Sequence, residues 1–164
     1  MKKLIIAALF VLPMSVFAQK FGHVNSETII KALPEYTKAM EDIQKMSKDY
    51  EDELTRMQSE LQTKSEELEK NPPAVETIKQ RKEQELQELY QRMQQFYQTS
   101  QQDLNKAQQE KMQPIITKVQ NAIKEVGVSG GYVYIMDTSS GIPFISETLS
   151  TDVTNTVKSK LGVK

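Results

Sequence analysis

The 164-residue chain contains no cysteine and no tryptophan, and its only histidine is His23. Without cysteine it can form neither disulfides nor thiolate metal sites. No serine–histidine motif and no glycine-rich phosphate loop is present, and a lone histidine in a strand is usually structural. We therefore expect a protein that is not an enzyme, with no catalytic residue, no bound metal and no cofactor.

The chain also lacks an excess of basic residues. Its 21 Lys and Arg stand against 22 Asp and Glu, which gives a formal net charge of -1. Nucleic-acid-binding proteins need clustered Lys and Arg to neutralise phosphates, so this composition argues against nucleic acid as a partner. The acidic cluster at residues 49–53 is typical of the solvated face of a helix.

Long apolar runs are missing except at the N-terminus. Two lysines precede the apolar run of residues 4–12, and Val16-Phe17-Ala18 supplies residues suited to signal cleavage. This layout predicts a secretory signal peptide over residues 1–18, because the run is too short to span a bilayer. An N-terminal membrane anchor is the alternative. We expect an exported chain that begins near Gln19 and has no membrane span after cleavage.

Glycine and proline are absent from residues 35–70, and apolar residues recur there at alternating spacings of three and four. This pattern predicts a coiled-coil helix, about 50 Å long at 1.5 Å per residue. The expected seam, meaning the stripe that packs on a partner helix, contains Leu33, Met40, Ser47, Leu54, Leu61 and Leu68 at one position and Tyr36, Ile43, Tyr50, Met57 and Lys64 at the other.

A second helix is expected from about residue 74 to 126, with its apolar stripe starting at Ile78 and Pro114 kinking or dividing it. Asn71-Pro72-Pro73 ends the first helix, and so short a loop requires the two helices to pack antiparallel. Residues 35–114 are thus predicted to form an arm with its tip near 71–73. Residues 35–70 carry eleven acids against six bases, and residues 73–126 seven against eight, which favours pairing of the helices.

Strand patterns lie at both ends of the hairpin. The sequence predicts strands at residues 21–25, 132–136 and 142–145, and Pro143 favours an edge position for the last one. A brief helix over 26–33 is expected to end at Pro34, residues 127–131 form a loop, and Thr151 caps a last helix with Val153, Val157 and Leu161 on one face.

Residues 19–34 and 115–164 are therefore expected to form a body with one small sheet. A sheet of this size is marginal alone, and its edges favour closure with copies of itself. The candidate self-association residues are Val24, Val133, Ile135, Ile142 and Phe144.

The second helix has a wider apolar stripe than a two-helix seam requires. Leu86 and Met93 are expected in the seam, with Leu89 and Phe96 on one flank and Tyr90 and Tyr97 on the other. The flanking residues either broaden the seam or form a soft surface that binds varied apolar segments. On the second interpretation the candidate binding residues are Tyr90, Tyr97, Met46 and Met57.

Several segments together resemble the Skp/OmpH family of periplasmic chaperones. They are Phe-Gly-His-Val-Asn at 21–25, the long hairpin, Lys-Val-Gln-Asn-Ala-Ile-Lys-Glu-Val at 118–126 followed by Tyr-Val-Tyr-Ile-Met-Asp at 132–137, and Ser-Thr-Asp-Val-Thr at 150–154. The resemblance implies a soluble periplasmic homotrimer whose strands form a central β-barrel. Three arms would surround a cavity that holds unfolded outer-membrane proteins without ATP. Some members have strongly basic arms, and because these arms are near neutral to acidic, no lipopolysaccharide-binding residues are carried over.

The expected fold class is therefore mainly α with a small β part, in which a long antiparallel helical hairpin is attached to a sheet that trimerises into a barrel body. The expected function is that of an ATP-independent holdase chaperone for unfolded outer-membrane proteins. The alternative is a structural or adaptor coiled coil of the cell envelope with fixed protein partners. A holdase should suppress the aggregation of several unrelated unfolded β-barrel proteins, whereas an adaptor should engage one partner.

Overall fold

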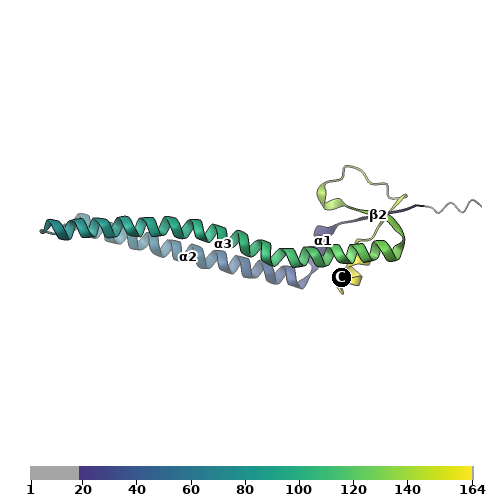
Figure 1. Ribbon diagram of the computed structural model, residues 1–164, viewed down its shortest axis with the longest axis horizontal. Helices are drawn as coiled ribbons and strands as arrows, with labels where there is room; N and C mark the ends of the chain where they lie inside the picture. The colour runs from purple at the N-terminus through teal and green to yellow at the C-terminus, as the bar shows by residue number, and fades with distance from the viewer. Residues whose placement is uncertain (1–18, 164) are drawn as a thin grey trace, which may run out of the picture.

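The computed structural model describes residues 19–163, which form a long helical hairpin joined to a small body (Figure 1). Helix α2 (Pro34–Lys70) runs out along the arm, and helix α3 (Glu76–Gly130) returns beside it and continues into the body. The prediction of a mainly helical fold with a long antiparallel hairpin and a small sheet is confirmed. The expected signal peptide, residues 1–18, lies outside the described residues.

The entry into the arm is built around Leu33 and Pro34. Helix α1 (Ser26–Ala32) ends at Leu33, where the backbone is extended, and Leu33 is also the N-cap of α2. Pro34 then occupies the first turn of α2, where its missing N–H costs nothing. The expectation that Pro34 ends the first helix is met, and the same residue starts the next one.

Helix α3 extends further than the sequence predicts. It continues through residues 127–130, and only Gly131 leaves the helix, with a left-handed φ of 66°. The loop expected at 127–131 is therefore wrong, and the physical reason is close packing. A Cβ added at Gly130 would lie 2.5 Å from the Tyr132 ring, and one at Gly127 would lie 3.4 Å from Ile135. These glycines let the last helical turns approach the sheet.

Pro114 lies inside α3 and does not divide it. Proline has no N–H to donate to the carbonyl one turn earlier, so one helical hydrogen bond is lost there. Figure 1 shows the green part of α3 changing direction gently between the arm and the body. The helix bends without interruption, as proline-containing helices commonly do.

The sheet has three parallel strands in the order β2-β1-β3. The central strand is β1 (Lys20–Val24), flanked by β2 (Tyr132–Asp137) and β3 (Ser150–Asp152). The prediction of a third strand at 142–145 is wrong, because that segment is a loop. Pro143 has no N–H to donate to a neighbouring strand, and β3 follows only after that loop.

The last helix, α4 (Thr154–Lys160), starts two residues later than a Thr151 cap would place it, because its N-cap is Val153. Thr151 lies in β3, and the carboxylate of Asp152 accepts the Thr154 N–H at 2.8 Å. One apolar core joins β1, α1, α3, α4 and the first turns of α2. Its buried members are Val24, Ile29, Leu33, Ala39, Ile115, Val119, Ala122, Val126, Val153 and Val157.

No helix within residues 19–163 has both the length and the apolar composition needed to cross a bilayer.

Candidate functional site

The seam of the arm is narrow. On the outer half of α3 its most buried apolar side chain is Leu89, at 3% exposure, while Leu86, Met93 and Phe96 are half-buried. Leu89 and Phe96 were expected on a flank, so the structure moves them into the seam. Two helices bury only the side chains that face each other, so the rest of each surface stays open.

On α2 the seam departs from the expected heptad at both ends. Met40 is exposed and the neighbouring Ala39 is buried in its place. At the tip Lys64 is exposed and pairs with Glu60 of its own helix, while Ser65 is half-buried. A straight helix has 3.6 residues per turn and drifts about 20° per heptad, which moves the seam to neighbouring positions over a long helix.

The two methionine candidates for a binding surface differ in burial. Met57 is 8% exposed, so it belongs to the seam and offers no surface to a partner. This corrects its assignment as a binding residue. Met46 is half-buried on the same helix. Met46 therefore keeps some accessible surface and remains a candidate, whereas Met57 does not.

Tyr90 and Tyr97 are the candidates that the structure leaves accessible, at 49% and 51% exposure. They lie seven residues apart on α3, which puts them on one face about two turns from each other. Gln94 lies between them and donates an amide hydrogen bond to the Tyr90 hydroxyl at 3.1 Å. This pair presents aromatic surface outside the seam.

The middle of the seam contains a polar layer that the sequence analysis missed. The Tyr50 hydroxyl donates to Oδ2 of Asp103 at 3.2 Å, and its ring meets the Phe96 ring edge-on at 5.7 Å. Burial, together with the hydrogen bond to Asp103, raises the pKa of Tyr50. Ser100, buried beside them, satisfies its hydroxyl with the Phe96 carbonyl. Such a layer fixes the register of the two helices, because a shift would leave polar groups unpaired.

Ion pairs join the two helices on the outside of the seam. Lys111 pairs with Asp42 at 2.7 Å, and Lys118 pairs with Glu35. A third pair, Lys82 with Glu67 at 3.3 Å, lies near the tip. In each pair the acid comes from α2 and the base from α3. This agrees with the excess of acidic residues in residues 35–70, which predicts pairing of the two helices. These groups are exposed and screened by solvent, so each pair contributes little to stability.

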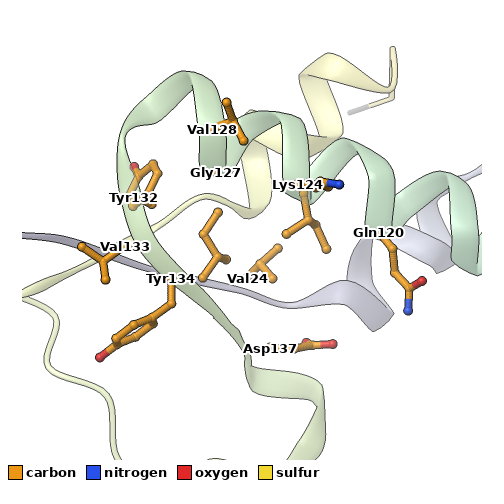
Figure 2. Close-up of a pocket in the computed structure, with 11 residues that line it drawn as sticks. Val24, Gln120, Lys124, Gly127, Val128, Tyr132, Val133, Tyr134 and Asp137 are labelled. Atoms are coloured by element: carbon orange, nitrogen blue, oxygen red, sulfur yellow. The ribbon is translucent and has the colours of Figure 1, made fainter.

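The body carries exposed apolar residues beside a groove. The groove, which we call the β2–α3 groove, has a volume of about 480 Å³. Figure 2 shows it between strand β2 and the last turns of α3. It is lined by Val24, Gln120, Ile123, Lys124, Gly127, Val128, Tyr132, Val133, Tyr134, Ile135 and Asp137.

The candidate self-association residues differ in how exposed they are. Val24 is 1% exposed in the core of its own chain, so it has no surface to offer a second copy. Ile135 and Ile142 are half-buried. Val133 on β2 and Phe144 in the loop after β2 are exposed, and they remain candidates.

The polar groups of the body are occupied by structural hydrogen bonds. Asp137 ends β2 and accepts the Ser26 N–H at 3.2 Å and the Ser139 N–H at 3.0 Å. Burial raises the pKa of the Asp137 carboxyl, but these bonds and one from the Ser26 hydroxyl together outweigh it and hold the pKa below its usual value. Nδ1 of His23 lies 2.9 Å from the Ser150 hydroxyl. Within residues 19–163 no group of His, Asp and Glu side chains is arranged to hold a metal ion.

One family of known proteins matches nearly all of the described residues. The family described as Outer membrane protein (OmpH-like) matches residues 20–161. No curated protein is similar enough to the chain to count as a relative.

Proposed function

The chain belongs to the OmpH-like family of outer membrane proteins, and on that premise we propose that it is an ATP-independent holdase chaperone of the periplasm. Its clients, meaning the proteins that it holds, are unfolded outer-membrane proteins in transit. The observation that carries the proposal is the exposed aromatic pair Tyr90 and Tyr97, outside a seam that is already complete without them.

The physical reasoning concerns apolar area. An unfolded client exposes apolar segments of varied sequence, and a holdase gains affinity by covering such surface on both partners. Aromatic side chains offer the largest contact area per residue, and the tyrosine hydroxyl stays hydrated at an exposed site. Each contact is weak, so binding depends on many contacts along the arms and declines gradually as they are removed.

We further propose that three copies associate through their bodies, formed by residues 19–34 and 115–164. The arms, residues 35–114, then project around a shared cavity. The three-stranded sheet supports this proposal, because both of its edge strands have a side that no described strand covers. Closure of three such sheets into a barrel would pair these edges. Residues 1–18 would direct export to the periplasm and be removed in the process.

The test is suppression of aggregation by the intact protein. Several unrelated outer-membrane proteins are diluted from denaturant with and without the chain, and light scattering is followed. We expect protection of all of them without ATP. Protection of a single partner, while the others precipitate, would instead support the adaptor function.

A matched pair of variants tests the surface. Tyr90→Ser with Tyr97→Ser should weaken client protection while the arm stays folded. The control is Gln91→Ser with Gln98→Ser, which changes exposed residues at the same spacing on the next position of α3. Equal protection by the wild-type, tyrosine and glutamine variants would show that the aromatic pair does not bind clients.

A further inference from the structure

We propose that a stripe of amide and tyrosine side chains on α3 binds one extended, uncharged strand segment of a client through the client's backbone. The inference deepens the proposed function and rests on it, because it names the class of segment that the arm recognises. The stripe, which we call the amide ladder, consists of Gln87, Tyr90, Gln94, Tyr97, Gln101, Asn105 and Gln108.

The amide ladder occupies a single face of the arm. Its members follow one another at spacings of three or four residues, and at 100° per residue they lie within an arc of about 80° around α3. All seven residues are exposed, although α2 lies beside this part of α3 (Figure 1). The buried positions of the same stretch, Leu89 and Ser100, belong to the seam. Packing of the two arm helices therefore leaves the ladder uncovered.

The amide ladder contains no charged residue. The charged side chains of residues 87–108 lie elsewhere on the helix. Glu88, Arg92 and Lys106 are at least about 140° from the centre of the ladder, and Asp103 belongs to the polar layer of the seam. Charge is thus separated from the ladder around the whole circumference of α3.

Solubility does not account for this lack of charge. Residues 42–63 of α2 carry nine charged residues, whereas residues 87–108 of α3, a stretch of the same length, carry four. Solvated helix faces are ordinarily charged, and α2 follows that rule. A partner without charge would explain the difference, because charged side chains covered by it would lose their hydration and gain no counter-ion.

The amides of the ladder are available to a partner. Outside the ladder, the Gln84 amide donates to the carboxylate of Glu88 at 3.0 Å. Inside the ladder, Gln94 donates to the Tyr90 hydroxyl at 3.1 Å, which holds amide and ring side by side. The other amides of the ladder form no hydrogen bond within residues 19–163. They can exchange water for the polar groups of a client.

An amide beside each ring meets the needs of an extended segment. A tyrosine ring that covers an apolar side chain also removes water from the backbone next to it, and a backbone N–H or C=O without a partner costs free energy. A glutamine amide supplies both a donor and an acceptor, whereas lysine only donates and a carboxylate only accepts. Amides beside the rings can therefore bind a backbone of any sequence, which suits varied clients.

The length of the ladder fits one strand. From residue 87 to residue 108 the helix rises by about 30 Å. An extended chain of nine or ten residues covers about the same distance, at roughly 3.3 Å per residue. A strand that spans the outer membrane has about 9–11 residues, and its side chains alternate along the chain with an apolar face for lipid. Before it folds, such a strand is an uncharged extended segment of the length that the ladder offers.

The first experiment replaces amides by an apolar side chain of similar length. Gln94→Met with Gln101→Met adds apolar area and removes two hydrogen-bonding groups. The control is Gln95→Met with Gln102→Met, which changes exposed residues at the same spacing, about 100° away around α3. For equal protection of an unfolded outer-membrane protein in light scattering, the ladder variant should be needed at about tenfold higher concentration than wild type or control. If apolar area alone decided binding, the ladder variant would protect at least as well as wild type, and the inference would be overturned.

The second experiment tests the backbone directly. The probe is a fluorescently labelled peptide of alternating serine and leucine, and its counterpart carries methyl groups on alternate backbone nitrogens. The two peptides have the same side chains, but the second lacks donors. Fluorescence anisotropy should show the wild type binding the methylated peptide about tenfold more weakly, with a much smaller difference for the variant Gln94→Met with Gln101→Met. Equal affinity of the wild type for both peptides, or binding of neither, would refute backbone recognition.

The outcomes are separable from those of the proposed function. A wild type that protects no client would refute the holdase function, whatever the peptides show. A wild type that loses protection when the tyrosines are replaced, but not when the amides are replaced, would refute only this inference. Displacement of the peptide by an N-acetylglucosamine oligosaccharide, whose hydroxyls also fit amides and rings, would assign the ladder to a glycan and overturn the inference as well.

Discussion

Replacement of Leu89 by Ala should open the arm without disturbing the body. Leu89 is 3% exposed at the centre of the outer seam, so the change removes buried carbon and leaves a cavity between two helices. Leucine-to-alanine changes at buried sites cost about 2–5 kcal/mol. Because only two helices surround this site and can close partly around the gap, we expect about 2–3 kcal/mol, at the lower end of that range.

That magnitude predicts a large local effect. Since each 1.4 kcal/mol is about a factor of ten, amide exchange in the outer half of α3 should accelerate roughly 30- to 140-fold. Exchange in β1 should be unchanged, because the body has its own core. The measurement is native-state hydrogen exchange resolved by segment.

The neighbouring residue supplies the control for this prediction. Tyr90→Ala changes a side chain that is half exposed, so it should cost well under half as much as Leu89→Ala. If the two changes accelerate exchange equally, Tyr90 is part of the seam. The separation between a buried seam and an exposed aromatic surface, and with it the basis of the proposed client surface, would then be wrong.

Three further predictions concern other parts of the molecule. Because hydrogen bonds hold the folded pKa of Asp137 below the unfolded value of about 3.9, its stabilisation is present above that pH and is lost as the pH falls through the folded value. Thermal melts of wild type and Asp137→Asn should therefore differ at neutral pH and converge as the pH is lowered through the folded value. Amide exchange should be fastest at residues 63–83, near the arm tip, and slowest in the central strand β1, and uniform protection would contradict this. Gly130→Val should destabilise the body, because its Cβ would meet the Tyr132 ring at 2.5 Å, and a melt at the wild-type temperature would refute the packing argument.

Much of the hairpin could be predicted from the sequence, because its determinants are local. Residues 35–70 lack helix breakers and repeat their apolar residues at helical spacing, so the extent of α2 is nearly that expected. The exact seam was less predictable. A strict heptad places Met40 and Lys64 inside, whereas the drift of a straight helix brings in Ala39 and Ser65.

The body was harder to predict because its strands pair over long sequence distances. Residues 142–145 have the stronger β-type composition, yet β3 forms at Ser150–Asp152, where the backbone meets β1 in register. The glycines at 127 and 130 read as helix breakers. Their helical conformation depends on the approach of Tyr132 and Ile135, which no local pattern reveals.

For the candidate site, the separation of the two tyrosines from the seam could be anticipated from their position on α3. Met57 was expected both at a seam position and among the candidate binding residues, and its burial agrees with the seam position alone. The polar layer of Tyr50, Ser100 and Asp103 also escaped prediction, because Tyr50 and Asp103 lie 53 residues apart and meet only once the helices are aligned.

The position of β1 at the centre of the sheet has a consequence for the order of folding. β1 precedes the hairpin in the sequence, and both of its partner strands, β2 and β3, follow the hairpin. The hairpin contacts nearest the tip join residues close in sequence, so they have a small loop-closure cost and can form early. Pairing of α2 with α3 that starts at the tip would then bring the strand segments at the two ends of the hairpin together, and the sheet would form last. A chain truncated before β3 should accordingly keep a zipped arm and leave β1 with one exposed edge, where it can pair with another unfinished chain.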